Sequence, residues 1–266
     1  MNLLVDSHCH LDFPDFADDL EGVMARAGNA GIGMCVTICT RLSTFDGVLA
    51  VAERFDNVYC SVGVHPHEAE SEGQRTANRL IELAAHPKVV GIGETGLDFY
   101  YDRSPRDRQA ESFHAHIDAA RETGLPLIVH ARDADAETAD ILSGEMANGT
   151  YTGLMHCFSS GRELAEKAVE IGLYISLSGI TTFKTAETVR DIARDVPLER
   201  LLVETDAPFL APVPHRGKRN EPAFVADTAA VIADLKGLSP AELADATTDN
   251  FFGLFTRADR GRLRAA

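Results

Sequence analysis

The 266-residue sequence lacks any uninterrupted apolar run approaching the ~20 residues that a membrane-spanning helix needs. Its start also lacks the basic-then-apolar pattern of a secretory signal. Cysteine is scarce: the chain has five. The number is odd and no two form a C-x-x-C pair, which argues against a disulfide framework. We therefore expect a soluble, unprocessed, cytoplasmic protein with reduced thiols and no membrane partner.

Lysine and arginine are outnumbered by acidic residues, 25 against 41, and the net charge is −16. This balance argues against a broad phosphate-neutralising surface of the kind that drives non-specific DNA binding. It does not exclude a nucleic-acid substrate, because bound divalent cations can supply positive charge where a phosphate sits. Any contact with nucleic acid should then be local and metal-dependent.

Eight apolar, strand-like runs alternate with helical patterns along the chain. The runs are Leu3–Ser7, Met34–Cys39, Val58–Val64, Val89–Gly93, Leu127–Val129, Gly153–Met155, Leu173–Ser176 and Leu201–Glu204. Continuous apolar strands joined by helices predict a parallel sheet buried on both faces. Eight such units in a chain of this length favour a closed (β/α)8 TIM barrel over an open sheet. No linker-like stretch divides the chain, so we expect a single α/β domain over residues 1–266.

Helical patterns fill the segments between these runs and continue after the last one. We expect helices at Asp18–Ala30, Thr44–Phe55, Thr76–Ala85, Arg106–Thr123, Ala136–Ser143, Arg162–Ile171, Ala186–Asp195 and Ala223–Leu235, with short pieces at Pro240–Ala246 and Asn250–Phe255. At the end of the long fourth helix, Gly124 and Pro126 block its continuation before the next strand begins.

Polar side chains follow six of the strand-like runs at their carboxyl ends. These ends carry His8 and His10, His65 and His67, Glu94 and Asp98, His130 and Arg132, His156, and Glu204 and Asp206. An isolated His-x-His pair is more often a surface feature, although strand alternation puts both rings on one side. A barrel gathers all these ends at one mouth, where the active site of this fold lies. The same alternation predicts that Cys9 and Cys157 pack in the core.

The residue types at these ends suit a metal site. Four imidazoles (His8, His10, His130 and His156) and two carboxylates (Glu94 and Asp206) suit zinc, manganese or magnesium. Six ligands exceed the needs of one tetrahedral ion, so two ions with a bridging group are more economical. Two divalent ions and two carboxylates leave a net positive charge that a hydroxide and a phosphodiester would neutralise. An ester or amide substrate also fits this charge count.

These motifs resemble those of the TatD-family metal-dependent deoxyribonucleases, within the wider amidohydrolase-like barrels. The resemblance runs almost from end to end, through Asp6–Asp12, Gly63–His67, Gly93–Asp98, Ile128–Arg132, His156–Ser159, Gly179–Lys184, Glu204–Leu210, Arg216–Pro222 and Thr247–Phe251. It implies a two-metal phosphodiesterase that trims DNA from a 3′ end. The expected substrate is single-stranded DNA or a 3′ end, with RNA as a further possibility. The oligomeric state stays open, and a monomer is plausible.

The resemblance also assigns the ligands of two divalent ions, either Mg²⁺, Mn²⁺ or Zn²⁺. His8, His10 and Asp206 would hold one ion, His130 and His156 the other, and Glu94 would bridge them. Many amidohydrolase relatives bridge with a carboxylated lysine, so Glu94 at that position favours the nuclease branch. Two departures from the family pattern occur, His215 where tyrosine is common and Phe252-Gly253 where arginine is frequent.

The expected reaction is hydrolysis by a metal-activated hydroxide. We expect Asp206 to orient the water and accept its proton, with Glu94 beside it. His65 is assigned to the scissile phosphate or leaving group, with a loop-capping histidine as the alternative, and His67 is a further substrate contact. The basic residues expected at flanking phosphates, with a solvated loop as the alternative for the last three, are Arg132, Lys184, Arg216, Lys218 and Arg219.

Two other functions remain open from the sequence. The same site could polarise a carbonyl, as in an ester or amide hydrolase such as an aminoacyl-tRNA deacylase. A barrel with a vestigial site could serve as a binding protein. Loss of ligands would mark that case, and all six ligand positions are filled.

Overall fold

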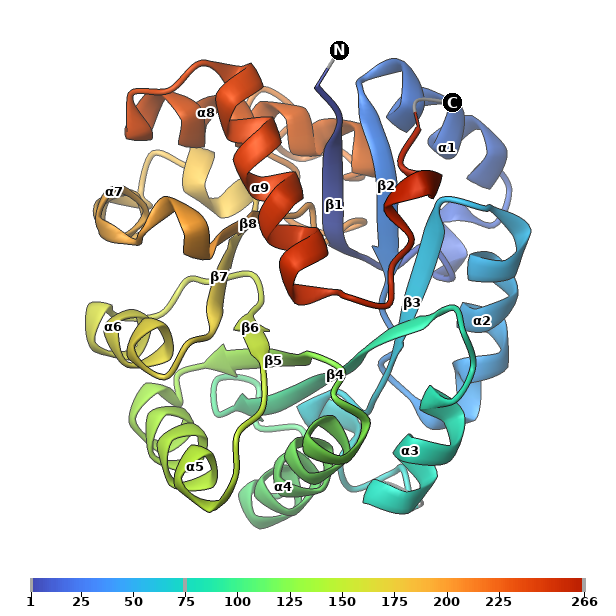
Figure 1. Ribbon diagram of the computed structural model, residues 1–266, viewed down its shortest axis with the longest axis vertical. Coiled ribbons are helices and arrows are strands. Elements are labelled where there is room, and N and C mark those ends of the chain that lie inside the picture. Colours follow the sequence, from blue (N-terminus) through green and yellow to red (C-terminus); the bar gives the residue numbers. More distant parts are fainter. Residues whose placement is uncertain (1, 74–75, 265–266) are drawn as a thin grey trace.

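The computed structural model describes residues 2–73 and 76–264, and it confirms the predicted TIM barrel (Figure 1). Eight strands form one sheet in the order of the sequence, and every neighbouring pair is parallel. The strands are β1 (Leu4–Cys9), β2 (Ile32–Thr37), β3 (Val58–Val62), β4 (Val89–Asp98), β5 (Leu127–Arg132), β6 (Gly153–Met155), β7 (Tyr174–Leu177) and β8 (Leu201–Val203). A bridge between Cys9 and Ala207 joins the two ends of the sheet.

Helices surround the ring of strands in the alternating order that the sequence predicts (Figure 1). They are α1 (Leu20–Asn29), α2 (Phe45–Arg54), α3 (Ala77–Ala84), α4 (Arg106–Thr123), α5 (Asp135–Asn148), α6 (Arg162–Glu170), α7 (Glu187–Asp195), α8 (Val225–Lys236) and α9 (Pro240–Leu254). In the described parts of the chain, no helix combines the length and apolar character needed to cross a membrane.

The two short helical pieces predicted near the C-terminus are wrong, because α9 is one continuous helix. Of the three residues between the pieces, Thr247 and Thr248 are poor helix formers in isolation. Here the Thr247 hydroxyl donates back to the carbonyl oxygen of Leu243 at 2.9 Å, and the Thr248 hydroxyl donates to that of Leu3 at 2.8 Å. Tertiary packing therefore overrides local propensity.

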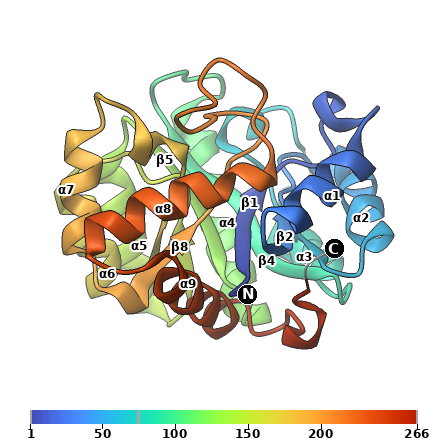
Figure 2. The ribbon, with the colours of Figure 1, turned by 90° about the horizontal axis from the view of Figure 1, so that it is seen from above.

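Two apolar layers hold the barrel together. Inward-facing side chains of the strands form an inner cluster, which α9 closes at the end where the strands begin (Figures 1 and 2). Phe251, Leu254 and Phe255 of this C-terminal region belong to that inner cluster. Outward-facing strand residues pack against the surrounding helices in a second, larger cluster. The loops that follow the strands rise at the opposite end (Figure 2), which leaves that mouth free for a site.

The strand β4 is longer than predicted, because it continues to Asp98 instead of ending at Gly93. The apolar pattern stops at Gly93, yet backbone pairing with β5 continues through polar residues up to Asp98 and Arg132. Gly96 allows this close approach: its φ is +134°, and a Cβ there would lie 2.0 Å from the carbonyl oxygen of His130. Glu94 therefore lies on a fixed strand and not on a loop.

Candidate metal centre

A cavity of about 1030 Å³ opens at the mouth of the barrel and collects the polar residues from the strand ends. The site residues predicted from the sequence that line it are His10, His65, His67, Glu94, His130, Arg132, His156 and Asp206. His8 is fully buried beneath them. Six separate strands thus bring their polar ends to one place.

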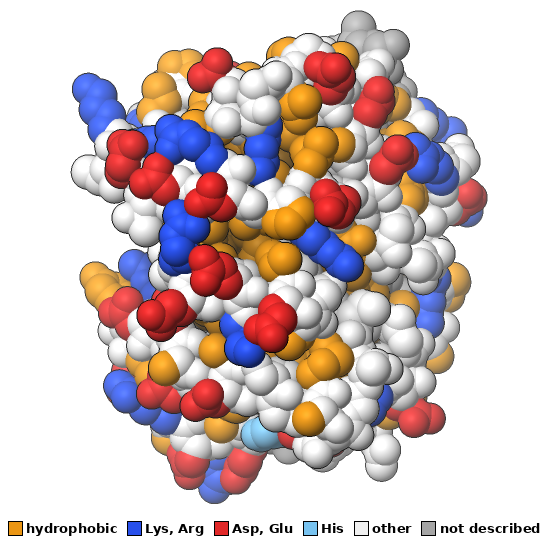
Figure 3. Space-filling model, turned by 60° about the vertical axis from the view of Figure 1, so that its left-hand side comes forward, with side chains coloured by type: hydrophobic (Ala, Val, Ile, Leu, Met, Phe, Trp, Pro, Cys, Tyr) orange, Lys and Arg blue, Asp and Glu red, His pale blue; other side chains and the backbone are white. Residues whose placement is uncertain are grey.

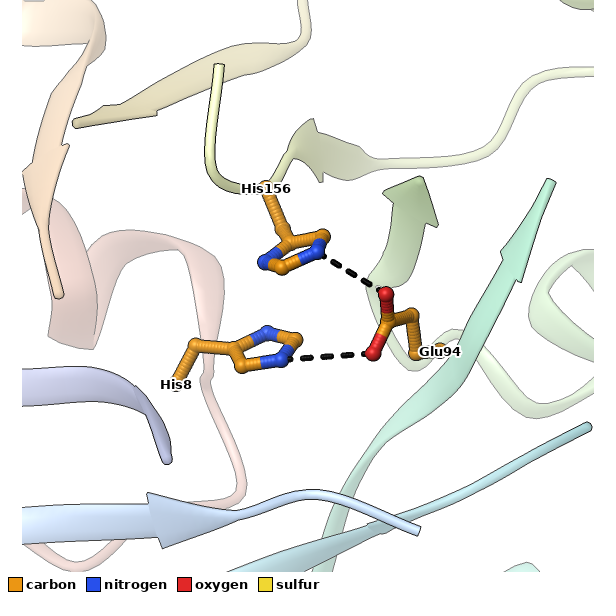
Figure 4. A group of neighbouring side chains, drawn as sticks. All are labelled: His8, Glu94 and His156. Atoms are coloured by element: carbon orange, nitrogen blue, oxygen red, sulfur yellow. Dashed lines mark ion pairs between the residues drawn. The ribbon is translucent and has the colours of Figure 1, made fainter. Parts of the chain in front are cut away.

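Glu94 lies at the centre of this cluster and divides its two oxygens between different imidazoles (Figure 4). Its Oε2 is 3.4 Å from Nε2 of His8, whereas its Oε1 is 2.9 Å from Nε2 of His156 and 3.0 Å from Nδ1 of His130. Burial alone would raise the pKa of Glu94, but His156, His65 and His130 outweigh it and hold that pKa well below its usual range. The carboxylate is therefore ionised.

Asp206 faces the same centre from the other side. Its Oδ1 lies 3.4 Å from Nε2 of His10 and 3.6 Å from Nε2 of His8. The backbone fixes it there, since the Asp206 amide donates to the carbonyl oxygen of His8 at 2.9 Å. Asp206 adopts a φ of +58°, a left-handed conformation that aspartate tolerates better than most residues. Burial opposes ionisation, but His10, His156 and His8 lower the pKa of this carboxyl.

A bulge in β1 directs the two histidines of the first strand into the site. Val5 belongs to the inner cluster, so strict alternation would turn His8 away from the barrel interior. The pairing of β1 with β2 shifts register between Asp6 and Cys9, and His8 faces Glu94 while Cys9 packs in the outer cluster. Bulges commonly re-aim side chains beside active sites. The predicted core position of Cys9 is confirmed, because beyond the bulge Cys9 faces away from His8 and His10 as alternation predicts.

The donor set fits divalent metal ions. Three groups of side chains each bring three potential ligand atoms within 4.8 Å of one another: His8 with Glu94 and His156, His8 with His10 and Asp206, and His65 with Glu94 and His130. Both ring nitrogens of His8 are buried without a hydrogen-bond partner, a costly arrangement that a metal ligand would resolve. Burial, with His156 nearby, lowers the pKa of His8, which favours the neutral form that binds metals.

Two buried carboxylates, Glu204 and Asp98, contact these imidazoles. Neither of them was assigned a function from the sequence. Glu204 Oε1 lies 3.0 Å from Nδ1 of His156, and Asp98 Oδ2 lies 3.2 Å from Nε2 of His130 and 2.8 Å from Nε2 of His67. Carboxylates in such positions orient histidine ligands. The available signal was their place in the motifs Gly93–Asp98 and Glu204–Leu210, but their partners are distant in sequence.

The structure shows His65 in the capping role that the sequence offered as the alternative, and its contact with the substrate stays a prediction. Its Nδ1 accepts a hydrogen bond from the backbone amide of His67 at 3.1 Å, so it caps the short helix that begins at Pro66. Its Nε2 lies 3.4 Å from Oε1 of Glu94. Burial lowers the pKa of His65 to about 4, so the ring is neutral at neutral pH. Because Nδ1 is an acceptor, the proton resides on Nε2, which faces the cavity.

The basic residues divide into those that line the cavity and those that do not. Of the predicted phosphate contacts, Arg132 lines it, and so do three arginines that the sequence did not single out, Arg41, Arg54 and Arg103. Their signal in the sequence is weak, because Arg41 and Arg103 lie in different loops and Arg54 ends α2, so only the folded chain brings them together. The other predicted contacts, Lys184, Arg216, Lys218 and Arg219, lie outside the lining.

The loop between β8 and α8 holds most of these outlying cations. The guanidinium of Arg216 sits 3.7 Å from the centroid of the Phe183 ring, and Arg219 pairs with Asp19 at 3.3 Å. His215 of the same loop stacks on Phe224 and lies 3.2 Å from Asp227. This departure from the family pattern therefore faces α8 and not the cavity.

The predicted core position of Cys157 is wrong, because this side chain is partly exposed and lines the cavity. The prediction assumed strand alternation, but β6 ends at Met155 and Cys157 adopts a φ of +44° in the turn beyond it. Its sulfur lies 3.2 Å from the hydroxyl oxygen of Ser178.

A smaller hollow of about 320 Å³ lies on the outer face between α6 and α7. Figure 3 views this side of the molecule, where acidic and basic side chains alternate around exposed apolar ones. Ala165, Val169 and Ile192 form its apolar floor, and Arg162 pairs with Asp195 at 2.6 Å on its rim. Its lining contains no histidine or cysteine among the described residues, so it offers no second candidate metal site.

Comparisons with known proteins agree with this geometry. The family model described as TatD related DNase matches residues 5–256. The metal-dependent hydrolase YcfH of Escherichia coli is 48% identical over 98% of both chains, and the metal-dependent hydrolase YabD of Bacillus subtilis is 40% identical over 95% of this chain and 99% of its own. The crystal structure of YjjV, a TatD homologue from Escherichia coli, superposes with a TM-score of 0.88 at 33% identity, covering 95% of this chain and 98% of that one.

Proposed function

The chain belongs to the TatD-related DNase family of metal-dependent hydrolases, and we propose that it hydrolyses phosphodiester bonds of DNA, trimming unpaired 3′ ends. The observation that carries this proposal is the position of Glu94 between two sets of imidazoles. Its Oε2 faces His8 and its Oε1 faces His130 and His156. A carboxylate so placed can serve two ions at once, as phosphodiester hydrolysis by a metal pair requires.

The proposed assignment of ligands is the one that the family resemblance implies, and the distances are compatible with it. His8, His10 and Asp206 would hold one ion, His130 and His156 the other, and Glu94 would bridge them. When bound, a pair of Mg²⁺, Mn²⁺ or Zn²⁺ ions supplies Lewis-acid polarisation of the phosphate and lowers the pKa of water toward neutrality. His65 belongs to one of the three candidate groups, but its Nε2 carries the proton, so we assign it to the substrate and not to a metal ion.

Two side chains would handle the proton and the phosphate. Asp206 is ionised at neutral pH, because neighbouring imidazoles lower its pKa, so it can orient the attacking water and accept its proton. Water adds to phosphorus as the bond to the leaving oxygen breaks. His65, neutral with its proton on Nε2, can donate a hydrogen bond to a phosphate or leaving-group oxygen.

The charges around the cavity also favour a phosphate substrate. Arg41, Arg54, Arg103 and Arg132 line the cavity of a chain whose net charge is −16. Arg41 and Arg54 are paired with Glu68 and Glu21, whereas Arg132 rests on the rings of Tyr100 and Tyr101. Arg103 also lies over the Tyr101 ring, but Arg132 ends β5 two residues after His130, so it is the cation we assign to a phosphate next to the scissile one.

The test is a substrate panel with and without chelator. Purified protein is incubated with 3′- and 5′-labelled single-stranded DNA, duplex DNA, RNA and an aminoacyl-tRNA, in Mg²⁺, Mn²⁺ or Zn²⁺. We expect chelator-sensitive shortening of single-stranded DNA from its 3′ end. Release of the amino acid from the tRNA without cleavage of any phosphodiester would replace the proposal with the carbonyl-directed alternative.

A further inference from the structure

Exposed aromatic side chains flank the cavity on two opposite sides. Among the described residues, the large hydrophobic side chains with high exposure are Tyr100 (57%), Tyr101 (50%), Phe209 (51%) and Val213 (47%). All four lie in two mouth loops, the one between β4 and α4 and the one between β8 and α8. Soluble proteins rarely concentrate exposed apolar surface without a binding role.

Phe209 is held rigidly beside the Asp206 side of the centre. The backbone amide of Phe209 donates to the carbonyl oxygen of Asp206 at 2.9 Å. The side-chain amide of Asn220 donates to the carbonyl oxygen of Phe209 at 2.6 Å. Its ring meets Phe13 edge-to-face at 6.0 Å, and Phe13 stacks on His10 at 4.7 Å. Phe209, Phe13 and the proposed metal ligand His10 therefore form a row of contacting rings, and the Phe209 ring is exposed at its end.

Tyr101 is held in an equivalent way on the His130 side. Its amide donates to Oδ1 of Asp98 at 2.8 Å, and the other oxygen of Asp98 faces His130 at 3.2 Å. The guanidinium of Arg132 lies 5.1 Å from the centroid of the Tyr101 ring and 4.3 Å from that of Tyr100. Aromatic surface and positive charge therefore coincide on this side.

The combination of flat aromatic surface, guanidinium and a phosphate-directed centre matches single-stranded nucleic acid. Bases of any sequence stack on aromatic rings, and nearby arginines track the backbone. In a duplex, the faces of the bases on both sides of a phosphodiester are covered by their neighbours. Only an unpaired strand can turn two successive bases apart.

Building on the proposed function, we infer that Tyr101 and Phe209 form a base clamp, defined as these two rings on opposite sides of the metal centre. One ring takes the base on the 5′ side of the scissile phosphate, and the other takes the base on its 3′ side. The clamp makes cleavage depend on the presence of unpaired bases, but not on their identity, because it contacts ring faces and no base edges.

The test compares two oligonucleotides that differ only in having bases or tetrahydrofuran abasic residues on both sides of the cleaved bond. For the wild-type protein we expect kcat/KM to be about tenfold or more higher with bases present. Tyr101→Leu and Phe209→Leu should each lose most of this preference, whereas Phe209→Tyr should retain it. Phe252→Leu, which removes a ring at the opposite end of the barrel, is the matched control.

The outcomes separate the clamp from the function on which it rests. Equal cleavage of both oligonucleotides by the wild-type protein, or an undiminished preference in both leucine variants, overturns the clamp while the nuclease stands. Failure of the wild-type protein to cleave either oligonucleotide overturns the proposed function and the clamp with it. Both rings are about half exposed, so thermal unfolding midpoints of the variants should match the wild type and exclude a folding defect.

Discussion

Nδ1 of His156 lies 3.0 Å from Oε1 of Glu204, and this contact turns the other ring nitrogen of His156 toward Glu94. Glu204 is fully buried and also accepts hydrogen bonds from the amide of Cys157 and the hydroxyl of Ser176. Each of its oxygens is therefore committed, and the carboxylate cannot swing into the cavity. It fixes which nitrogen of His156 is available to a metal ion.

Glu204→Gln should weaken metal binding without removing a ligand. The variant keeps the shape of the side chain but loses the charge that supports the His156 imidazole, so we expect metal affinity to fall about 10- to 100-fold. Isothermal titration with Mn²⁺ measures this change, and excess metal should restore most of the activity. Glu199→Gln, an exposed position just before β8, is the control. Unchanged Mn²⁺ affinity in Glu204→Gln would show that Glu204 does not orient His156 for metal binding.

Glu94→Ala should abolish turnover and reduce the number of bound ions. Loss of the proposed bridge removes several kcal/mol of transition-state stabilisation, which corresponds to a fall in kcat of about a thousandfold or more. Equilibrium dialysis should also show less than two ions per chain. Asp206→Ala should lose activity similarly, since it removes both a ligand and the proton acceptor. Turnover near the wild-type rate in either variant would refute the two-metal scheme.

The barrel and the positions around its mouth could be predicted because they depend on local patterns. Apolar runs alternating with helical ones give the order of the elements, and a parallel barrel brings every strand end to one mouth. His8 and Asp206 are 198 residues apart in the chain (206 − 8), yet both follow from this rule. The chemistry of imidazoles and carboxylates then indicates a metal site.

Features that depend on tertiary contacts could not be predicted in the same way. The extension of β4 through polar residues to Asp98 results from pairing with β5, which leaves no apolar signal. Arg41, in the loop after β2, and Arg54, at the end of α2, both line the cavity, where they pair with Glu68 and Glu21. A single sequence contains these residues but not the contacts that give them a role.

The predicted basic contacts can be ranked by their salt dependence. Arg132→Ala should raise KM for single-stranded DNA and reduce the slope of log KM against log salt by about 0.7, the value for one phosphate contact. The double variant Arg216→Ala/Lys218→Ala should also raise KM and flatten the slope, because we expect this exposed loop to contact the strand beyond the cavity. Assays between 50 and 300 mM salt, about the range over which screening changes most, measure both slopes.

Arg162→Ala, on the outer face between α6 and α7, is the control for the salt measurements because it lies away from the mouth. An unchanged slope in the double variant would assign Arg216 and Lys218 to the solvated loop alone. An unchanged slope in Arg132→Ala would refute the assignment of Arg132, which lies over the Tyr100 ring, to a substrate phosphate.

The buried imidazole of His116 should make stability depend on pH. Its Nε2 accepts a hydrogen bond from the amide of Val64 at 2.9 Å, and its Nδ1–H donates to the carbonyl oxygen of Ser112 at 2.6 Å. Burial lowers its pKa from 6.5 to about 4. Above pH 6.5 the ring is neutral in both the folded and unfolded states, so the full stability is present. As the pH falls toward 4, only the unfolded state takes up the proton, and stability is lost.

The loss should reach about 3 kcal/mol in the free energy of unfolding near pH 4, since each pKa unit corresponds to 1.36 kcal/mol. His116→Gln can accept from Val64 and donate to Ser112 without titrating, so the difference between wild type and variant should shrink or reverse over this range. Urea unfolding in the presence of chelator measures it, with His86→Gln on the surface as the control. If the free energy of unfolding depends on pH in the same way for the wild type and His116→Gln, this ring is not the titrating group. The loss of stability in acid would then be assigned to the imidazoles around Glu94.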